Sequence, residues 1–420
     1  MSRVLNVWWD ERLVGRLSQN RHGELGFAYA PEWLRADDSA SSLSVSLPLR
    51  AEPFSRPECG PFFSGLLPDE GQRDAVARRL GVSRGNVYAL LERLGGDVAG
   101  ALQLLPPGES PVAVSADAPA GPLDPGELAA VLDALPVRPL LAGEKGLRLS
   151  LAGAHSKLPV VLVDSDVALP VPGQATTHIL KAPILRFPDS VENEALVMRL
   201  AARIGLDTAP VEARDVDDRK FLVVGRYDRR IVGTGPVARI HQEDFCQALG
   251  IWPERKYAGE GGPTLRDCFE LLRGIAARPA VEVLKLMDAT IFNLIAGNAD
   301  AHGKNFSLLY TDSGPVLAPL YDLLTTIAYP ELSPRLAMKI GKRRTLDEMD
   351  GRGWESFASE AGLGLPLVRR RVAEIAAAVR TDAGDVAGVL EEEGLDGTVL
   401  AGFVKTIAAR ANRCASTVRR

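Results

Sequence analysis

The polar loop around residues 297–305 carries the side chains best suited to chemistry. An apolar, helix-like run stops at Gly297, and Asp300 and Asn305 follow it with four residues between them. In phosphoryl transfer, an aspartate at this spacing orients a hydroxyl and accepts its proton, while the asparagine carbonyl binds magnesium. Taken alone, the two residues could equally be turn or capping residues, because loops are rich in both types.

A second carboxylate follows at the distance that this chemistry requires. Strand-like residues 306–310, a turn at 312–314 and an apolar segment 316–320 lead to Asp322. Protein kinases place their second metal-binding aspartate at the far end of such a hairpin. Asp322 is therefore the second candidate magnesium ligand, although Leu-Leu stands where kinases usually have Phe-Gly.

Two charged residues upstream fit the same chemistry. Lys181 ends a predicted strand at 177–181, and Glu194 lies on a predicted helix from Glu192 to Ile204. A lysine held by a helix glutamate could bind the α and β phosphates of ATP. Each residue alone could be a solvated strand-end charge or a first-turn carboxylate favoured by the helix dipole. The order of all five features favours a protein kinase that uses ATP and Mg²⁺.

The elements that must position these residues follow from the periodicity of apolar residues. The first hundred residues alternate as in a small twisted sheet and then become helix-like from Asp69 to about Leu94, and 106–125 is rich in proline, glycine, serine and alanine, as in a linker. Later segments predict four strands, two of them joined by a turn at Asp217 and Asp218, and then three helices. The strands are Leu158–Val163, Thr177–Lys181, Val211–Val216 and Phe221–Val224, and the helices lie in 281–296, 367–379 and 396–410.

This pattern predicts an α+β protein with a two-lobed, protein-kinase-like fold. The N-terminal part is expected to be β-rich with an extra small N-terminal subdomain, and the C-terminal lobe to be all-helical. The expected domains are 1–122, a small sheet with helices; 123–238, a kinase-like N-lobe with the phosphate loop; and 239–420, the helical C-lobe.

Composition narrows the class of protein. The 420 residues are 46% apolar and carry a net charge of −5, which gives no global reason to bind nucleic acid or an anionic membrane. The four cysteines are far apart and form no zinc motif, which indicates reduced thiols. The N-terminus becomes charged too early for a signal peptide, and no apolar stretch of about eighteen residues exists. We expect a cytoplasmic protein that does not enter a membrane.

Many ordered segments resemble the HipA family, the kinase toxins of bacterial HipBA toxin-antitoxin modules, and the resemblance covers nearly the whole chain. The matching segments are 62–68, 100–106, 150–157, 177–181, 192–194, 241–250, 256–257, 298–307 and 321–324.

The resemblance implies roles for residues that their types alone leave open. Ser150 would be an autophosphorylation site whose modification ejects its loop and switches the kinase off. The small residues Ala152, Gly153 and Ala154 would let backbone N–H groups approach phosphate, although alone they could form only a tight turn. Lys157 would contact phosphate or be a surface lysine. His155 stands where the family usually has glutamine.

Two further contacts with the nucleotide are expected. His302 matches the family's catalytic loop and would touch ATP. The hinge for adenine is expected near Gly225, Arg226 and Tyr227, just after the last strand, although relatives often carry glutamate at position 225.

The family also implies partners: a HipB-like helix-turn-helix antitoxin, operator DNA bound mainly through that antitoxin, and a protein substrate from translation such as an aminoacyl-tRNA synthetase. Two alternatives stay open. The chain could be a catalytically silent, kinase-shaped protein that only binds the antitoxin, or a kinase for a small molecule or lipid.

Overall fold

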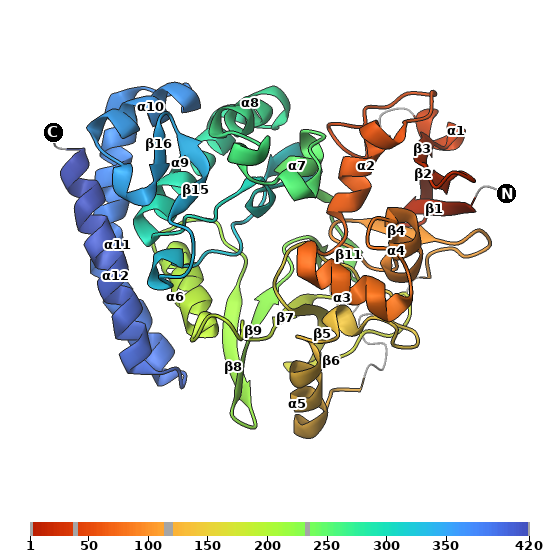
Figure 1. The fold of residues 1–420 in the computed structure, drawn as a ribbon, viewed down its shortest axis with the longest axis horizontal. Coiled ribbons are helices and arrows are strands. Elements are labelled where there is room, and N and C mark those ends of the chain that lie inside the picture. The colour runs from red at the N-terminus through yellow and green to blue at the C-terminus, as the bar shows by residue number, and fades with distance from the viewer. Residues whose placement is uncertain (1–2, 37–40, 113–120, 232–235, 419–420) are drawn as a thin grey trace. The chain divides into compact units, whose positions relative to one another are not determined.

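A computed structural model describes residues 3–36, 41–112, 121–231 and 236–418. The chain forms two compact units: unit 1 comprises Met1–Ala182 and Asp215–Glu254, and unit 2 comprises Pro183–Arg214 and Arg255–Arg420. Figure 1 labels the elements of both. The expected three-part division stays a prediction, and the observed units group the segment 183–214 with the C-terminal helices.

Unit 1 begins with a four-stranded antiparallel sheet in the order β3-β2-β1-β4. Alternate residues of β1 and β3 are buried, as the sequence pattern predicted, and pack with aromatic residues of the helices that follow. The elements are β1 (Arg3–Trp9), β2 (Arg12–Gln19), β3 (Leu25–Tyr29), α1 (Pro31–Leu34), α2 (Arg56–Gly65), α3 (Glu70–Leu80), α4 (Val87–Leu94) and β4 (Leu102–Leu105).

The helix-like stretch from Asp69 to Leu94 consists of two helices, so the prediction of one helical stretch was incomplete. Gly81 ends α3 in the left-handed conformation with a φ of 65°. Asn86 then caps α4, because its side chain accepts a hydrogen bond from the Ala89 N–H. A glycine stop and an asparagine cap are the local signals for such a break.

A second sheet in unit 1 has the strand order β6-β5-β7-β9, and β8 (Val211–Val216) spans the boundary between the units. The predicted strands are confirmed, and the turn residues Asp217 and Asp218 have φ of 45° and 63°, as a tight hairpin requires. The other elements of this part are α5 (Pro125–Ala134), η2 (Pro139–Leu141), β5 (Lys157–Val163), β6 (Asp166–Ala168), β7 (His178–Lys181), β9 (Arg219–Gly225), β10 (Arg229–Arg230), β11 (Ala238–Arg239), β12 (Gln242–Asp244) and α7 (Phe245–Ala248), with η3 (Pro253–Arg255) at the boundary.

The predicted linker at 106–125 is only partly described, because 113–120 lie outside the described residues. Its last residues are ordered against the second sheet: Pro122 bridges Ala168, and the Leu123 N–H donates to the Val167 carbonyl at 2.8 Å.

Unit 2 is rich in helices, and all three predicted helical segments are confirmed. It contains α6 (Ser190–Arg203), η4 (Ala258–Glu260), α8 (Leu265–Ile275), α9 (Pro279–Ala296), η5 (Gly303–Asn305), β13 (Ser307–Thr311), β14 (Gly314–Leu317), η6 (Thr326–Ala328), β15 (Arg335–Ile340), β16 (Arg343–Thr345), η7 (Leu346–Glu348), α10 (Gly351–Ala361), α11 (Leu365–Glu392) and α12 (Gly397–Thr417).

The C-terminal part is therefore not all-helical, which corrects the sequence prediction. The hairpin β13-β14 was anticipated, but β15-β16 was not. The strands of the second hairpin are short, and their basic residues hide the apolar alternation on which strand prediction depends.

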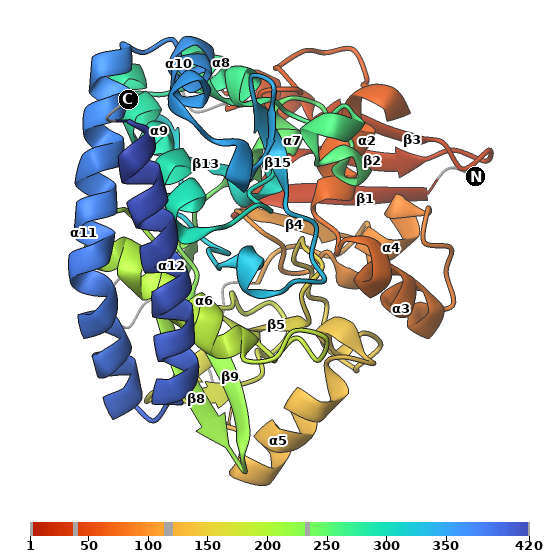
Figure 2. The ribbon, with the colours of Figure 1, turned by 60° about the vertical axis from the view of Figure 1, so that its left-hand side comes forward.

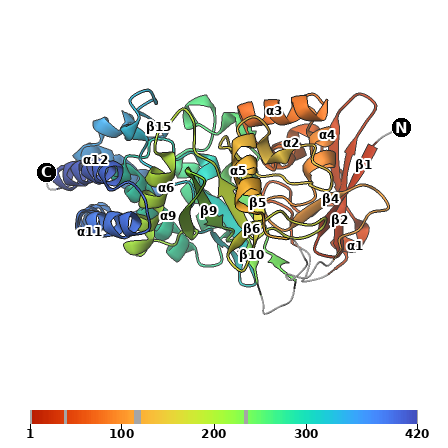
Figure 3. The ribbon, with the colours of Figure 1, turned by 90° about the horizontal axis from the view of Figure 1, so that it is seen from below.

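The long helices α11 and α12 form a hairpin that packs on α9 and α6 within unit 2. Figures 2 and 3 show the two side by side. Arg410 of α12 is buried and donates hydrogen bonds to the carbonyls of Leu294 and Leu346. This packing fixes α9, the helix that leads into the loop with Asp300 and Asn305.

The four cysteines are buried free thiols, as predicted. Among the described residues, no helix has the length and apolar character needed to cross a bilayer.

A buried ionic cluster ties the first sheet of unit 1 to its second. The Asp97 carboxylate meets Arg226 at 3.2 Å, Arg229 at 2.9 Å and Arg239 at 3.2 Å, and it accepts a hydrogen bond from Thr176. Burial alone would raise the pKa of Asp97, but the charges of Arg229, Arg226 and Arg239 outweigh it, so this pKa lies below its usual range. Asp97 is therefore ionised and compensated in the folded chain.

We predict that Asp97→Asn destabilises the protein by about 3 to 5 kcal/mol at pH 7, because it leaves buried arginines without their counter-charge. Since the folded pKa is depressed, this contribution exists above the unfolded pKa of about 4 and is lost as pH falls below it. Urea unfolding at pH 7 and at pH 3 measures it. An equal loss from Asp97→Asn at both pH values would contradict this assignment.

Candidate active site

The loop of unit 2 that contains Asp300 and Asn305, the candidate catalytic loop, starts where α9 ends. Gly297 caps that helix with a φ of 79°, and a Cβ there would lie 2.7 Å from the Ile327 side chain, so only glycine fits. Next, the Asn298 side chain donates to Asn293 at 2.8 Å and accepts from the Asp300 N–H at 3.0 Å. Asn298 thereby fixes the backbone conformation at Asp300.

Asp300 is exposed and reachable by a substrate. Its Oδ1 accepts a hydrogen bond from the Tyr257 hydroxyl at 3.0 Å. An exposed carboxylate whose backbone is fixed fits the expected role of proton acceptor.

The spacing of Asp300 and Asn305 brings the asparagine to Asp322. Asn305 Nδ2 donates to Asp322 Oδ2 at 3.0 Å, and Asn305 Oδ1 accepts from the His302 N–H at 3.2 Å. Asp322 has a φ of 59°, a strained conformation for a residue with a side chain. The two predicted metal ligands therefore lie together, with backbone strain at one of them.

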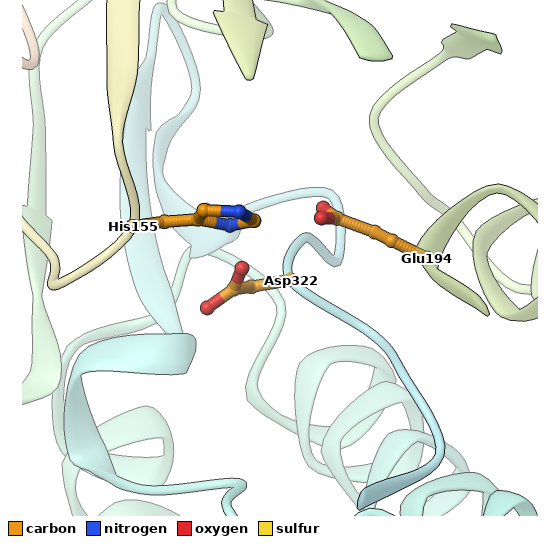
Figure 4. Close-up of side chains that lie close together, drawn as sticks. All are labelled: His155, Glu194 and Asp322. Atoms are coloured by element: carbon orange, nitrogen blue, oxygen red, sulfur yellow. The ribbon is translucent and has the colours of Figure 1, made fainter. Parts of the chain in front are cut away.

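Glu194 joins this pair from α6. A carboxylate oxygen of Glu194 and one of Asp322 lie within 4.8 Å of each other, and Figure 4 shows their side chains. The expected contact of Glu194 with Lys181 stays a prediction, and within unit 2 the Asp322 carboxylate lies near Glu194. Two carboxylates this close repel each other unless a cation lies near them.

The donor set fits magnesium. Two carboxylates and an amide provide the hard oxygen ligands that Mg²⁺ takes in phosphate-transferring sites, without nitrogen or sulfur ligands from unit 2. The residues that would hold the ion are Asp322, Asn305 and Glu194.

Asn193, next to Glu194, braces α6 against the segment that follows Asp322. Its Nδ2 donates to the Thr325 carbonyl and to the Tyr329 hydroxyl, both at 3.1 Å, and its Oδ1 accepts from the Thr325 N–H at 2.8 Å. The side chain is fully buried. These bonds hold the two carboxylates of Figure 4 in place.

In unit 1, two lysines lie side by side on neighbouring strands of the second sheet. Lys157 of β5 and Lys181 of β7 are directly paired in the antiparallel register, so their side chains leave the same face. Lys157 Nζ lies 2.7 Å from the place of a Cβ on Gly153, whose φ is 106°. The two ammonium-bearing side chains therefore start from one face of the second sheet, on neighbouring strands.

The loop that contains Ser150 is held by the N-terminal part of unit 1. The Ser150 N–H donates to the Asp97 carbonyl at 2.9 Å, and its hydroxyl donates to the Leu66 carbonyl at 2.7 Å. The Asp69 N–H donates to the Gly153 carbonyl at 3.1 Å. Ser150 is fully buried in this arrangement.

The remaining residues of this loop differ in their exposure. Ala152 is partly exposed, Ala154 is exposed, and His155, labelled in Figure 4, is partly exposed. Contact of these residues with phosphate stays a prediction.

Several polar groups at the expected adenine hinge already form hydrogen bonds or ion pairs with other parts of unit 1. The Arg226 guanidinium belongs to the Asp97 cluster, and the Arg226 N–H donates to the Thr177 carbonyl at 3.0 Å. The Arg226 guanidinium and N–H are thus used within unit 1. The hinge was expected to bind adenine through backbone groups, and a contact of the Arg226 carbonyl with the base stays a prediction. Tyr227 donates its hydroxyl to Gln242. Contacts of adenine with Gly225 and Tyr227, and of ATP with His302, stay predictions.

Asn193, Asn298 and Tyr257 were not predicted as site residues. A polar residue within a helix that must bury its inner face needs hydrogen-bond partners, which is the signal that could have identified Asn193. The pattern Asn-x-Asp directly after a helix-ending glycine is typical of an Asx-turn and could have identified Asn298.

Comparison with known proteins agrees with this geometry. The HipA-like C-terminal domain model matches residues 149–386, and the HipA N-terminal domain model matches residues 5–105. The chain belongs to the HipA family.

Similar proteins span its whole length. Y4mE of Sinorhizobium fredii, a protein named for an expected kinase activity, is 63% identical and covers 97% of this chain and 98% of its own. The serine/threonine-protein kinase toxin HipA of Shewanella oneidensis is 31% identical over 86% of this chain and 84% of its own.

The same fold is found in a solved complex of HipA, HipB and operator DNA from Shewanella oneidensis. Its similar chain has a TM-score of 0.86 and 28% identity, and the match covers 99% of this chain and 98% of that one. The kinase-like α+β fold expected from the sequence is confirmed.

We predict that Asn193→Ala destabilises unit 2 by about 2 to 4 kcal/mol, since it leaves the N–H and the carbonyl of Thr325 without the Asn193 side chain that binds both. Urea unfolding measures the change. Asn412→Ala, at an exposed position of α12, is the matched control and stays within about 0.5 kcal/mol of the parent protein. Equal stability of the two variants would contradict the role of Asn193 in holding α6 to the segment that follows Asp322.

Proposed function

We propose that this protein is an ATP- and Mg²⁺-dependent serine/threonine protein kinase and the toxin of a HipBA-type module. The observation that carries the proposal is the cluster of Asp322, Asn305 and Glu194, with the exposed Asp300 carboxylate on the same catalytic loop as Asn305. Two carboxylates beside an asparagine amide suit a divalent cation that accompanies a triphosphate.

Each part of the chain has its own task in this reaction. Asp300 accepts the proton of the acceptor hydroxyl, whose oxygen bonds to the γ-phosphorus as the bond from that phosphorus to the β,γ-bridging oxygen breaks. Lys157, Lys181 and the loop 152–154 bind the phosphates. Asp322, Asn305 and Glu194 would hold Mg²⁺, which supplies positive charge to the phosphate oxygens.

Ser150 is the proposed autophosphorylation site. It is fully buried, and its hydroxyl is bonded to the Leu66 carbonyl, so its loop must leave this position before the serine can accept phosphate. Once phosphorylated, the serine carries about two negative charges and is too large to return to a position where its hydroxyl is fully buried against the Leu66 carbonyl. Autophosphorylation would therefore remove the phosphate loop.

The proposed partners follow from family membership. The similarity to a chain from a complex of HipA, HipB and operator DNA supports a HipB-like helix-turn-helix antitoxin, which would carry most of the DNA contact. The net charge of −5 agrees with a complex in which the antitoxin makes most of the DNA contact. A translation component such as an aminoacyl-tRNA synthetase is the proposed acceptor.

We predict that purified protein with labelled ATP and Mg²⁺ phosphorylates itself on Ser150, and that Asp300→Ala lowers the rate about 100-fold or more by removing the proton acceptor. Phosphopeptide mapping and label incorporation measure this. Asp300→Ala should keep the parent's unfolding midpoint, because Asp300 is exposed. Undiminished labelling in this variant would contradict the assigned role.

The acceptor can be identified in cells. Phosphoproteomics of cells expressing the parent protein, compared with Asp300→Ala, should show new phosphoserine or phosphothreonine on a translation protein in the first culture alone. Identical phosphoproteomes in the two cultures would favour the silent antitoxin-binding alternative. A phosphorylated metabolite or lipid without a phosphoprotein would favour the small-molecule alternative.

A further inference from the structure

The segment just before α8 holds Tyr257 rigidly beside the catalytic loop. The Tyr257 carbonyl accepts hydrogen bonds from the N–H groups of Glu260 and Gly262, both at 2.9 Å. Gly262 packs so closely that a Cβ there would lie 2.1 Å from the Arg255 carbonyl oxygen and 2.7 Å from that of Tyr257. The backbone of Tyr257 is therefore fixed by a turn that only glycine can complete.

The same segment is attached to the catalytic loop. The Gly303 N–H donates to the Lys256 carbonyl at 3.4 Å. Gly303 belongs to η5, which ends at Asn305. The turn that carries Tyr257 is thus connected to the loop that carries both Asp300 and Asn305.

The ring of Tyr257 is also held. The His302 ring meets it edge-on, with centroids 5.4 Å apart and planes at 80°. The Lys256 ammonium lies 5.5 Å from its centroid, within the range of a cation–π contact. These two contacts restrict rotation of the ring about its side-chain bonds.

The hydroxyl of this fixed ring reaches Asp300. It donates to Oδ1 at 3.0 Å. The end of an exposed aspartate side chain rotates through a broad range of angles, and a donor of fixed position selects one orientation. A carboxylate has two oxygens that can each accept hydrogen bonds, so a donor on one leaves the other to face an acceptor hydroxyl.

We propose that Tyr257 is a positioning residue that holds the Asp300 carboxylate in the orientation needed to take the acceptor's proton. This proposal rests on the kinase function proposed above and deepens it. Tyr257 touches neither phosphate nor metal in this role, and it acts through Asp300. An error of about 1 Å in a catalytic group can cost on the order of 100-fold in rate, so a fixed donor at this point matters.

A different role would be that of a plug, in which the phenol takes the place of the acceptor hydroxyl at Asp300 and must move away. The two roles predict opposite effects of removing the hydroxyl. The fixed backbone and the two ring contacts favour positioning, because a plug needs freedom to leave.

The test is the rate of Ser150 phosphorylation measured against ATP concentration for the full chain, Tyr257→Phe and Tyr257→Ala. We expect Tyr257→Phe to lower the maximum rate about 10-fold and to leave the half-saturating ATP concentration within about twofold, since ATP contacts are unchanged. Tyr257→Ala should lose little more. Tyr88→Phe on α4, in unit 1, is the control and should keep the parent's rate.

An unchanged or increased maximum rate in Tyr257→Phe would overturn the proposal, as would a change confined to the half-saturating ATP concentration. Crystal structures of the parent protein and Tyr257→Phe decide the matter even if the parent transfers no phosphate. One Asp300 side-chain orientation in the parent and several in the variant would support the proposal, and the same single orientation in both would overturn it. An inactive parent protein would contradict the proposed kinase function separately.

Discussion

The proposed function depends on side chains of like charge that lie close together within each unit. In unit 2 the carboxylates of Glu194 and Asp322 approach within 4.8 Å, and in unit 1 Lys157 and Lys181 are paired across two strands. Like charges this close are unfavourable by themselves, and groups of opposite charge near them, from the protein or from a ligand, offset that cost. In the proposed reaction, Mg²⁺ would suit the carboxylates of unit 2, and phosphate oxygens would suit the lysines of unit 1.

Hydrogen bonds and ion pairs within each unit hold the segments that carry these charged side chains in place. Asn193 anchors α6 to the segment after Asp322 by three hydrogen bonds, and Asn305 binds Asp322 directly. In unit 1 the Ser150 loop is bonded to Leu66 and Asp97 of the N-terminal part, and Asp97 is itself held by buried arginines. This gives the N-terminal part a physical role, because it keeps the loop that would bind phosphate in place.

Local patterns in the sequence predicted a large share of this structure. Gly297 marked the end of α9, and the spacing of Asp300, Asn305 and Asp322 predicted a shared loop and hairpin, because these features depend on neighbours within about 25 residues. The brace of Asn193 could not be predicted, since its partners lie 132 and 136 residues away. The cluster around Asp97 could not be predicted for the same reason, since Arg229 lies 132 residues from Asp97 in the sequence. Because this cluster could not be foreseen, Arg226 was expected to lie at the adenine hinge.

The most direct test of the paired-charge account is calorimetric titration of the full-length protein with ATP, once with Mg²⁺ and once with a chelator of divalent cations. The account predicts clear binding with Mg²⁺ and binding at least about 10-fold weaker without it, since the carboxylates of unit 2 then repel the triphosphate. Equal affinity under the two conditions would contradict it.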